Sequence, residues 1–130
     1  MRFFSAVDEN VGRNPIAQAM AKASLRTAAR DFRIQCYLYP EGEPATAYDT
    51  AGSLFAVALK LVEGGAYADR VGALKGAKSC CDQRLSQGSR WHTQDAAALD
   101  VGMQVAEEII GQSKPKEVQQ AWLATRTVEA

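Results

Sequence analysis

The sequence is poor in the residues that build metal sites and disulfide frameworks. It has three cysteines, at positions 36, 80 and 81, and one histidine. The cysteine count is odd, the adjacent pair cannot easily bridge to itself, and neither C-x-x-C nor Cys/His zinc spacing occurs. We therefore expect no disulfide framework, no metal ion and no other cofactor, and we predict a reducing, cytoplasmic compartment.

An excess of charge of one sign is also lacking. The chain carries 15 basic and 15 acidic residues, which leaves a net charge of zero. Proteins that bind DNA or anionic membranes usually carry an overall basic excess, so here only a local patch could do such work. No apolar run approaches the length of a membrane span, and the start, MRFFSAVDEN, lacks the apolar core of a signal peptide. We predict a small soluble protein with no membrane partner.

The common sequence signatures of catalysis are missing as well. None of the motifs G-x-x-x-x-G-K-[ST], G-x-G-x-x-G and H-E-x-x-H occurs. One of the adjacent cysteines can be combined with His92 and Asp95 into a nucleophile set only on paper, because nothing fixes their geometry. Lys78 falls in an apolar helical stripe, but no partner residue accompanies it, and such lysines usually extend their ammonium group to water. We therefore expect no catalytic residues and predict that the protein is not an enzyme.

What the chain does contain is an ordinary globular composition with clear helical periodicity. Its 130 residues are 47% hydrophobic, which suits one domain with a self-sufficient core. Apolar residues recur at helical spacing in five segments that are separated by glycine, proline and turn residues. The expected helices cover residues 15–32, 46–64, 67–85, 94–110 and a last segment that opens at 113–115. We predict a mainly α fold in which residues 1–130 form a single domain, a bundle of about five helices.

The segment 46–64 is the expected centre of this bundle. Its apolar residues cover more than half of the helical circumference, and its polar stripe is narrow. A helix that is apolar over so wide an arc is usually packed by several neighbours. We therefore predict that 46–64 forms the central helix.

One stretch after the first helix has the alternation of a β-strand instead. In RIQCYLYP, the side chains of Ile34, Cys36 and Leu38 alternate with Gln35, Tyr37 and Tyr39. Residues 33–39 could pair with residues 2–7 as a short N-terminal β-ribbon, or the stretch could be the end of the first helix. Two strands alone are marginal, so the ribbon is an optional addition to the bundle.

A basic ridge is the clearest surface signal. It consists of four cations at spacings of four, four and three along the first helix, opposite its apolar stripe: Lys22, Arg26, Arg30 and Arg33. Such a line could follow a nucleic-acid backbone or meet an acidic protein face. The alternative is that the ridge is simply the solvated side of an amphipathic helix, which every surface helix needs. Aromatic residues are not interleaved among the cations, which weakens the case for nucleic acid.

An acidic ridge of opposite sign lies on the expected fourth helix. It contains Asp100, Gln104, Glu107 and Glu108. These residues could dock on the basic ridge within one chain or across a dimer, or could imitate nucleic-acid phosphates. Three carboxylates are few for mimicry, and a solvated helix face is the competing interpretation.

Two further features point to contacts between helices or proteins. Gly72, Gly76 and Cys80 form a row of small residues at helical spacing, which would suit a tight helix crossing or a docking groove. Arg90 and Trp91 precede the fourth helix, and arginine and tryptophan are common at interface hot spots. Trp91 could equally cover the end of the core, because an indole's size suits either role.

These observations favour a non-enzymatic protein-binding module that acts by occupying a surface. An accessory subunit, or a mobile-element-encoded inhibitor of a host defence complex in the manner of anti-CRISPR proteins, would fit, although this rests on size and missing chemistry alone. The predicted partner is another protein or protein complex. The predicted partner-binding residues are Lys22, Arg26, Arg30, Arg33, Arg90 and Trp91. A nucleic-acid-associated regulator that uses the basic ridge is the alternative, and a homodimer remains open.

Overall fold

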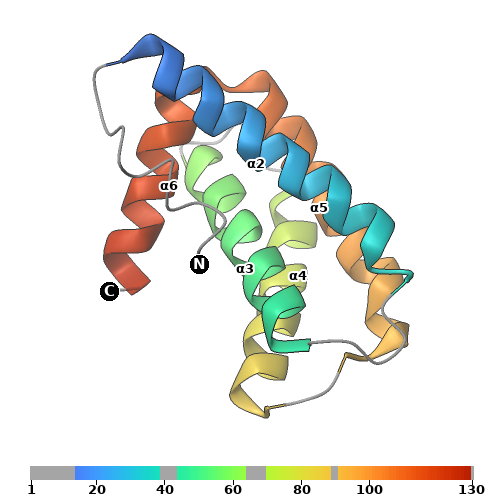
Figure 1. Cartoon of the computed structure of the whole chain (residues 1–130). Helices are drawn as coiled ribbons and strands as arrows, with labels where there is room; N and C mark the ends of the chain where they lie inside the picture. Colours follow the sequence, from blue (N-terminus) through green and yellow to red (C-terminus); the bar gives the residue numbers. More distant parts are fainter. Residues whose placement is uncertain (1–13, 39–43, 64–69, 89–90, 130) are drawn as a thin grey trace.

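The computed structural model describes residues 14–38, 44–63, 70–88 and 91–129. These residues form a bundle of five α-helices (Figure 1), which confirms the predicted mainly α fold. The helices are α2 (Pro15–Gln35), α3 (Pro44–Leu61), α4 (Val71–Ser86), α5 (Ala96–Gln112) and α6 (Pro115–Glu129), and the short 3-10 turn η3 (Thr93–Asp95) leads into α5. Within the described ranges, none of the helices has the length and apolar character needed to cross a membrane.

Helix α3 is the centre of the bundle, as its wide apolar arc predicts. It contacts α2, α4, α5 and α6, and Figure 1 shows it between them. Its side chains of Tyr48, Leu54 and Phe55 have no exposed surface and belong to the same core cluster as Leu25 and Phe32 of α2. The helix begins at Pro44, two residues before the expected start, and ends at Leu61.

Helix α2 begins at Pro15, the first residue of the expected helix 15–32. The side chain of Asn14 accepts a hydrogen bond from the backbone N–H of Ile16 at 2.9 Å, and Pro15 occupies the first helical position. This is the usual N-cap arrangement, because it satisfies an otherwise unpaired N–H and uses the fixed φ of proline. Its buried face is formed mostly by small residues: Ala17, Ala21, Leu25, Ala28, Ala29 and Phe32.

Of the two interpretations of residues 33–39, the end of the first helix is confirmed as far as Gln35, and the optional β-strand is wrong. Helix α2 continues to Gln35, and the backbone N–H of Cys36 still donates to the carbonyl of Phe32 at 2.8 Å, in helical register. Residues 36–38 form a turn. Residue 39 and the proposed partner strand 2–7 lie outside the described ranges. The helical rotation of about 100° per residue explains the error. It buries Cys36 but leaves Ile34 and Leu38, which a strand would place on the same side as Cys36, 64% and 68% exposed.

The predicted small-residue crossing lies elsewhere than expected. A Cβ added at Gly72 or Gly76 would meet nothing within 4 Å, so neither glycine serves a close approach. The tight contact is one residue further along α4, where Ala77 lies against Gly102 of α5. Residues at positions 76 and 77 point about 100° apart, so a one-residue difference moves the contact from solvent to the core.

The corner between α5 and α6 is short and closely hydrogen-bonded. The hydroxyl of Ser113 donates to the carbonyl of Ile109 at 2.7 Å, and the backbone N–H of Lys114 donates to the carboxylate of Glu117 at 3.2 Å. Helix α6 then starts at Pro115. This corner lies against α2, because the ammonium group of Lys22 donates to the carbonyl of Ser113 at 2.8 Å.

Candidate protein-contact surface

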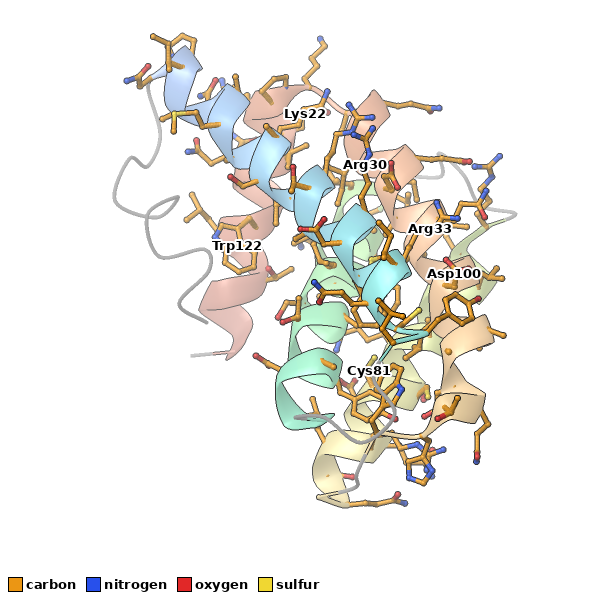
Figure 2. All side chains as sticks on the ribbon, turned by 45° about the vertical axis from the view of Figure 1, so that its right-hand side comes forward. Lys22, Arg30, Arg33, Cys81, Asp100 and Trp122 are labelled. Carbon is orange, nitrogen blue, oxygen red and sulfur yellow. The ribbon has the colours of Figure 1, made fainter. Side chains whose placement is uncertain are left out.

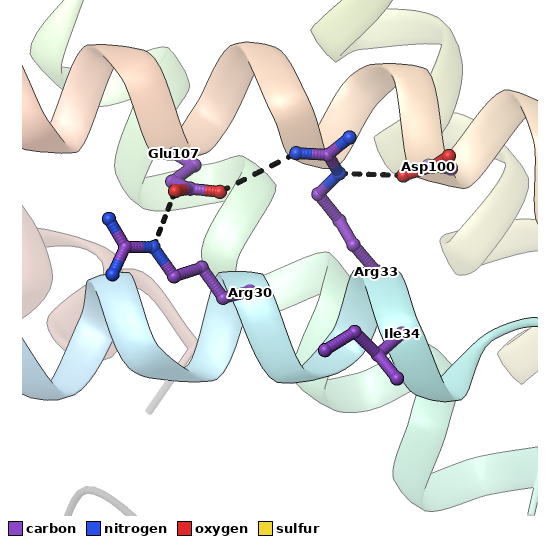
Figure 3. A pocket seen from close by; sticks show the side chains of 5 residues that line it. All are labelled: Arg30, Arg33, Ile34, Asp100 and Glu107. Atoms are coloured by element: carbon purple, nitrogen blue, oxygen red, sulfur yellow. Dashed lines mark hydrogen bonds and ion pairs between the residues drawn. The ribbon is translucent and has the colours of Figure 1, made fainter.

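The C-terminal half of the basic ridge faces the acidic ridge of α5. Arg30 Nε lies 2.7 Å from Glu107 Oε1, and Arg33 Nε lies 2.7 Å from Asp100 Oδ1. Arg33 Nη1 also reaches Glu107 Oε2 at 3.7 Å, so the four side chains form one chain of ion pairs across the two helices (Figure 3). Asp100 and Glu107 of the acidic ridge therefore pair with the basic ridge within one chain, which is one of the arrangements expected from the sequence. We call this chain of ion pairs the charge ladder.

Tyr37 extends the charge ladder at one end. Its hydroxyl donates to Asp100 Oδ2 at 2.9 Å. The hydrogen bond from Arg33 to Asp100 is the main cause that raises the pKa of the Arg33 guanidinium. The hydrogen bond from the Tyr37 hydroxyl to Asp100 is the main cause that raises the pKa of the Tyr37 phenol. A shallow hollow of about 420 Å³ lies over the ladder and is lined by Arg30, Arg33, Ile34, Asp100 and Glu107. Its charged groups already pair with one another, so the ladder acts first as a link between α2 and α5.

Reversing one charge of the ladder should therefore lower stability. We expect Arg33→Glu to lower the free energy of unfolding by about 1 kcal/mol, because a third carboxylate would face Asp100 and Glu107 at a partly exposed site. The double variant Arg33→Glu/Asp100→Arg should recover most of that loss. Urea unfolding followed by circular dichroism measures both.

A matched control comes from the exposed pair of Lys78 and Asp82, whose atoms lie 3.0 Å apart one turn along α4. Lys78→Glu should cost only a few tenths of a kcal/mol, because an i,i+4 pair on one helix contributes about that much. Equal losses for Lys78→Glu and Arg33→Glu, or no recovery in the double variant, would contradict a stabilising role for the ladder.

The N-terminal half of the basic ridge is held differently. Lys22 donates to the carbonyl of Ser113, and neither it nor Arg26 has an ion pair among the described residues. Arg26 packs on Gly111, where an added Cβ would lie 3.2 Å from its Nε. Figure 2 shows Lys22, Arg30 and Arg33 in succession along the side of α2 that faces α5. The predicted ridge is thus one line of cations in space, but only Arg30 and Arg33 are matched by carboxylates.

A second surface on α2 was not anticipated from the sequence. The described part of the chain has seven large hydrophobic side chains that are exposed, and five of them lie on α2 or in the turn after it. The exposed fractions are 71% for Ile16, 63% for Met20, 64% for Ile34, 56% for Tyr37 and 68% for Leu38. Ile16, Met20 and Ile34, with the exposed Ala23 and Thr27 between them, form a mostly apolar row on the side of α2 away from the core, and Leu38 follows in the turn after it. We call Ile16, Met20, Ala23, Thr27, Ile34 and Leu38 the outer row.

The outer row has a sequence signal that a search for one stripe overlooks. From Ile16 to Ile34 its members are separated by four, three, four and seven residues, which keeps them on one side of α2, and Leu38 follows in the turn after the helix. The inner face, from Ala17 to Phe32, satisfies the same spacing rule and has more members. The alternation of residues 33–39 also fits a strand, which obscures the helical spacing of Ile34. A helix that carries apolar rows on two sides usually has a neighbour on both.

Trp91 covers the end of the core, which is the second of its two predicted roles. Only 5% of its surface is exposed, so it is not available to a partner in this conformation. Its ring lies edge-on to Phe32, with centroids 6.3 Å apart, and tilted against Tyr48 at 4.9 Å. Arg90, its predicted companion, lies outside the described residues.

The thiols of Cys80 and Cys81 and the Lys78 side chain, which were considered for catalysis, lie on α4. Cys81 is fully buried, and desolvation raises its pKa to about 12. Burial also raises the pKa of Cys80, so neither thiol is poised to ionise near neutral pH. Lys78 lies on a partly exposed side of α4 and donates to Asp82. Among the described residues, no cluster of three or more histidines, cysteines or carboxylates could hold a metal ion.

Asp95 belongs to a buried polar network that ties three elements together. It accepts hydrogen bonds from Arg84 Nε at 2.8 Å, from Arg84 Nη2 at 3.1 Å and from the Tyr48 hydroxyl at 2.7 Å. The Tyr48 oxygen in turn accepts the backbone N–H of His92 at 3.0 Å. Burial by itself would raise the pKa of Asp95, but the hydrogen bonds from Arg84 and Tyr48 outweigh it and hold the pKa below its usual value. The network joins α3, α4 and η3, and both carboxylate oxygens of Asp95 accept hydrogen bonds within it.

Fold and surface together define a five-helix α-bundle with a charge ladder on one side of α2 and an outer apolar row on another. No family model matches the chain, and no curated protein and no solved structure matches it either.

Proposed function

We propose that this chain is a non-enzymatic protein-binding module and that its contact surface is the outer row of α2. The observation that carries the proposal is the concentration of exposed large hydrophobic side chains on α2 and in the turn after it. Isolated exposed hydrophobic residues are normal on a protein surface, but several aligned on one helix are typical of protein contact sites. An accessory subunit or an inhibitor that occupies a partner's surface would use such a face without further chemistry.

The state of the thiols and of the buried network supports a binding role over a catalytic one. The pKa values of Cys80 and Cys81 are raised, and the carboxylate of Asp95 is committed to Arg84 and Tyr48. A nucleophile or a general base needs the opposite arrangement, with a lowered thiol pKa or a carboxylate open to substrate.

A nucleic-acid-associated regulator remains the second candidate, but the charge ladder weakens it. Arg30 and Arg33, half of the predicted basic ridge, are neutralised by Glu107 and Asp100. A protein that follows a phosphate backbone needs cations that are free to replace the counterions of the nucleic acid.

Affinity capture from a native lysate tests the proposal. The tagged wild-type chain is compared with an outer-row variant, Ile16→Ser/Met20→Ser/Ile34→Ser/Leu38→Ser, and captured proteins are quantified by mass spectrometry with and without nuclease. The matched control removes exposed hydrophobic residues elsewhere, as Leu85→Ser/Val101→Ser. Both variants should stay folded, because they change exposed positions.

We expect at least one captured protein to fall more than tenfold with the outer-row variant, to be retained by the control, and to be insensitive to nuclease. A set of captured proteins that is the same for all three chains would overturn the proposal. Capture that nuclease abolishes would favour the nucleic-acid alternative instead.

A further inference from the structure

The part of the outer row that lies on α2 has the spacing of a coiled-coil seam. Its members follow one another at intervals of four, three, four and seven residues: Ile16, Met20, Ala23, Thr27 and Ile34. At about 100° per residue, they lie within about 60° of one another around the helix. Steps of three and four residues that alternate in this way let one helix pack along another. The row therefore fits the side of a second helix of similar length.

The row also lacks charge over most of its length. Every exposed side chain from Pro15 to Thr27 is uncharged, and the two cations of this stretch, Lys22 and Arg26, are partly buried and contact α5 or the residue after it. A solvated helix face normally carries charged residues. The centres of protein interfaces, in contrast, are depleted of charge. A partner helix on this side of α2 would therefore cover the first three turns without desolvating a charged group.

The two edges of the row carry charges of opposite sign near its C-terminal end. Arg30 borders the row on the side that faces α5, and Asp31 borders it on the other side, with Ile34 between them one turn further on. Arg30 is 58% exposed and donates to Glu107 through Nε, and an arginine has four further N–H groups. Asp31 is exposed and takes part in no ion pair among the described residues.

We infer that the outer row binds the outer row of a second copy of this chain, with the two α2 helices parallel to each other. The inference rests on the proposed function for the contact surface and adds the identity of the partner. The two-fold axis would run along the helices, so each residue of the row meets its own copy and each edge meets the opposite edge of the other copy. Arg30 of one copy then faces Asp31 of the other, and this ion pair occurs twice.

Charge complementarity favours this arrangement over its alternatives. An antiparallel pair would set the basic edge, with Arg30 and Arg26, against the basic edge of the other copy, and would leave Asp31 without a cation. An unrelated helix could cover the apolar side chains, but it would have to supply its own acid and base at matching positions. A second copy supplies both by symmetry.

The size of the contact sets the expected strength of the dimer. From Ile16 to Ile34 the seam is about 27 Å long, at 1.5 Å per residue, and it is one helix wide. Such a contact lies at the small end of specific interfaces, which bury roughly 1,200 Å² in total. We therefore expect a reversible dimer with a dissociation constant of about 10–100 µM.

Sedimentation equilibrium from about 5 to about 500 µM tests the inference, because this range brackets the expected dissociation constant. The seam variant is Met20→Lys/Thr27→Lys, which sets each new lysine against its own copy. The control is Val101→Lys/Gln104→Lys, which adds the same charge at exposed positions of α5. We expect the seam variant to dimerise at least tenfold more weakly than the wild-type chain and the control to stay within twofold of it. Circular dichroism checks that both remain helical.

Reversal of the unpaired carboxylate tests the charged edges. Asp31→Lys would turn both ion pairs of the parallel dimer into repulsions. We expect it to weaken the dimer about tenfold at low salt and less at high salt, since salt screens exposed charges. The control Asp82→Lys makes the same change of charge on α4, where Asp82 is 58% exposed, and should leave the dimer within twofold of wild type.

Cross-linking through one engineered cysteine tests the orientation. Met20→Cys is made in a Cys80→Ser background, because Cys80 is partly exposed whereas Cys36 and Cys81 are buried. In the parallel dimer the new thiol lies beside its own copy. In an antiparallel dimer in which Ile16 meets Ile34, the two thiols would be about 15 Å apart along the helices. We expect mild oxidation to give a covalent dimer with Met20→Cys and none with Val101→Cys in the same background.

The inference fails on any of three results: a monomer at every concentration, equal weakening by the two lysine pairs, or a dimer that does not cross-link through Met20→Cys. The proposed function is judged separately, by the serine variant of the outer row and the proteins other than this chain that it captures. A monomeric chain whose serine variant loses a captured protein keeps the binding module and refutes the second copy. A dimer whose serine variant captures the same other proteins as wild type keeps the second copy and refutes the module.

Discussion

Replacing Asp95 with alanine is expected to lower the free energy of unfolding by about 2–4 kcal/mol, as measured by urea unfolding at neutral pH. Asp95 is only 8% exposed and accepts hydrogen bonds from Arg84 and Tyr48. Its loss leaves the guanidinium of Arg84 without its counter-charge and the hydroxyl of the fully buried Tyr48 without its acceptor. Removing one partner of a buried charged network costs more than the intact network contributes, because the groups that remain are already desolvated.

Asp82→Ala is the matched control for Asp95→Ala. Asp82 also pairs with a cation, Lys78, but its side chain is 58% exposed. Its removal should change stability by less than about 0.5 kcal/mol, since water replaces the lost contact. Tyr48→Phe should fall between the two, at about 1–2 kcal/mol, because it removes the hydroxyl and keeps the packed ring. Similar losses for Asp82→Ala and Asp95→Ala would show that the buried network does not stabilise the fold.

Acid titration gives an independent measure of the Asp95 network. The pKa of Asp95 is lower in the folded chain than its ordinary value. A carboxylate with a lowered folded pKa contributes stability above its unfolded pKa of about 3.9, and this contribution is lost as the pH falls toward the folded pKa. The wild-type chain should therefore lose more stability than Asp95→Asn between about pH 5 and pH 2. Parallel pH profiles for the two chains would contradict the assignment.

The helices and the core could be predicted because their signals are local. The cap at Asn14–Pro15, the inner face of α2 and the wide apolar arc of α3 each depend on residues a few positions apart. On α6, Val118, Ala121 and Trp122 are buried at the same kind of helical spacing. Hydrophobic periodicity reports which side of a helix faces inward, and it does so without knowledge of the neighbour.

The surface could be predicted only in part, because its pairing joins distant parts of the chain. Arg33 and Asp100 are 67 positions apart, and Arg30 and Glu107 are 77 apart. The sequence showed two ridges of opposite sign, but their spacing does not say whether they meet within one chain, in a dimer, or not at all. The split of the basic ridge into a paired half and an unpaired half depends on how α2 crosses α5, which no local pattern encodes.

The tight contact between α4 and α5 leads to a prediction in which the same substitution has opposite effects at two glycines. A Cβ built on Gly102 would lie 2.7 Å from the Cβ of Ala77 and 3.1 Å from Cε1 of Phe55. The Cβ of Ala77 has no rotamer by which to move aside, and Phe55 is fully buried, so the two helices would have to separate. We expect Gly102→Ala to lower the free energy of unfolding by about 1–3 kcal/mol, despite the better helix propensity of alanine.

Gly76→Ala should instead raise the free energy of unfolding by about 0.5–1 kcal/mol. Gly76 is exposed in the interior of α4, and an added methyl group there would meet nothing within 4 Å. Alanine would therefore restrict the unfolded chain and favour the helix at no steric cost. Because Gly76 is adjacent to Ala77, the residue that Gly102 contacts, the pair of variants separates helix propensity from packing at one helix crossing. Urea unfolding of both should show shifts of opposite sign, and a shift of the same sign would mean that α5 does not cross α4 at Ala77.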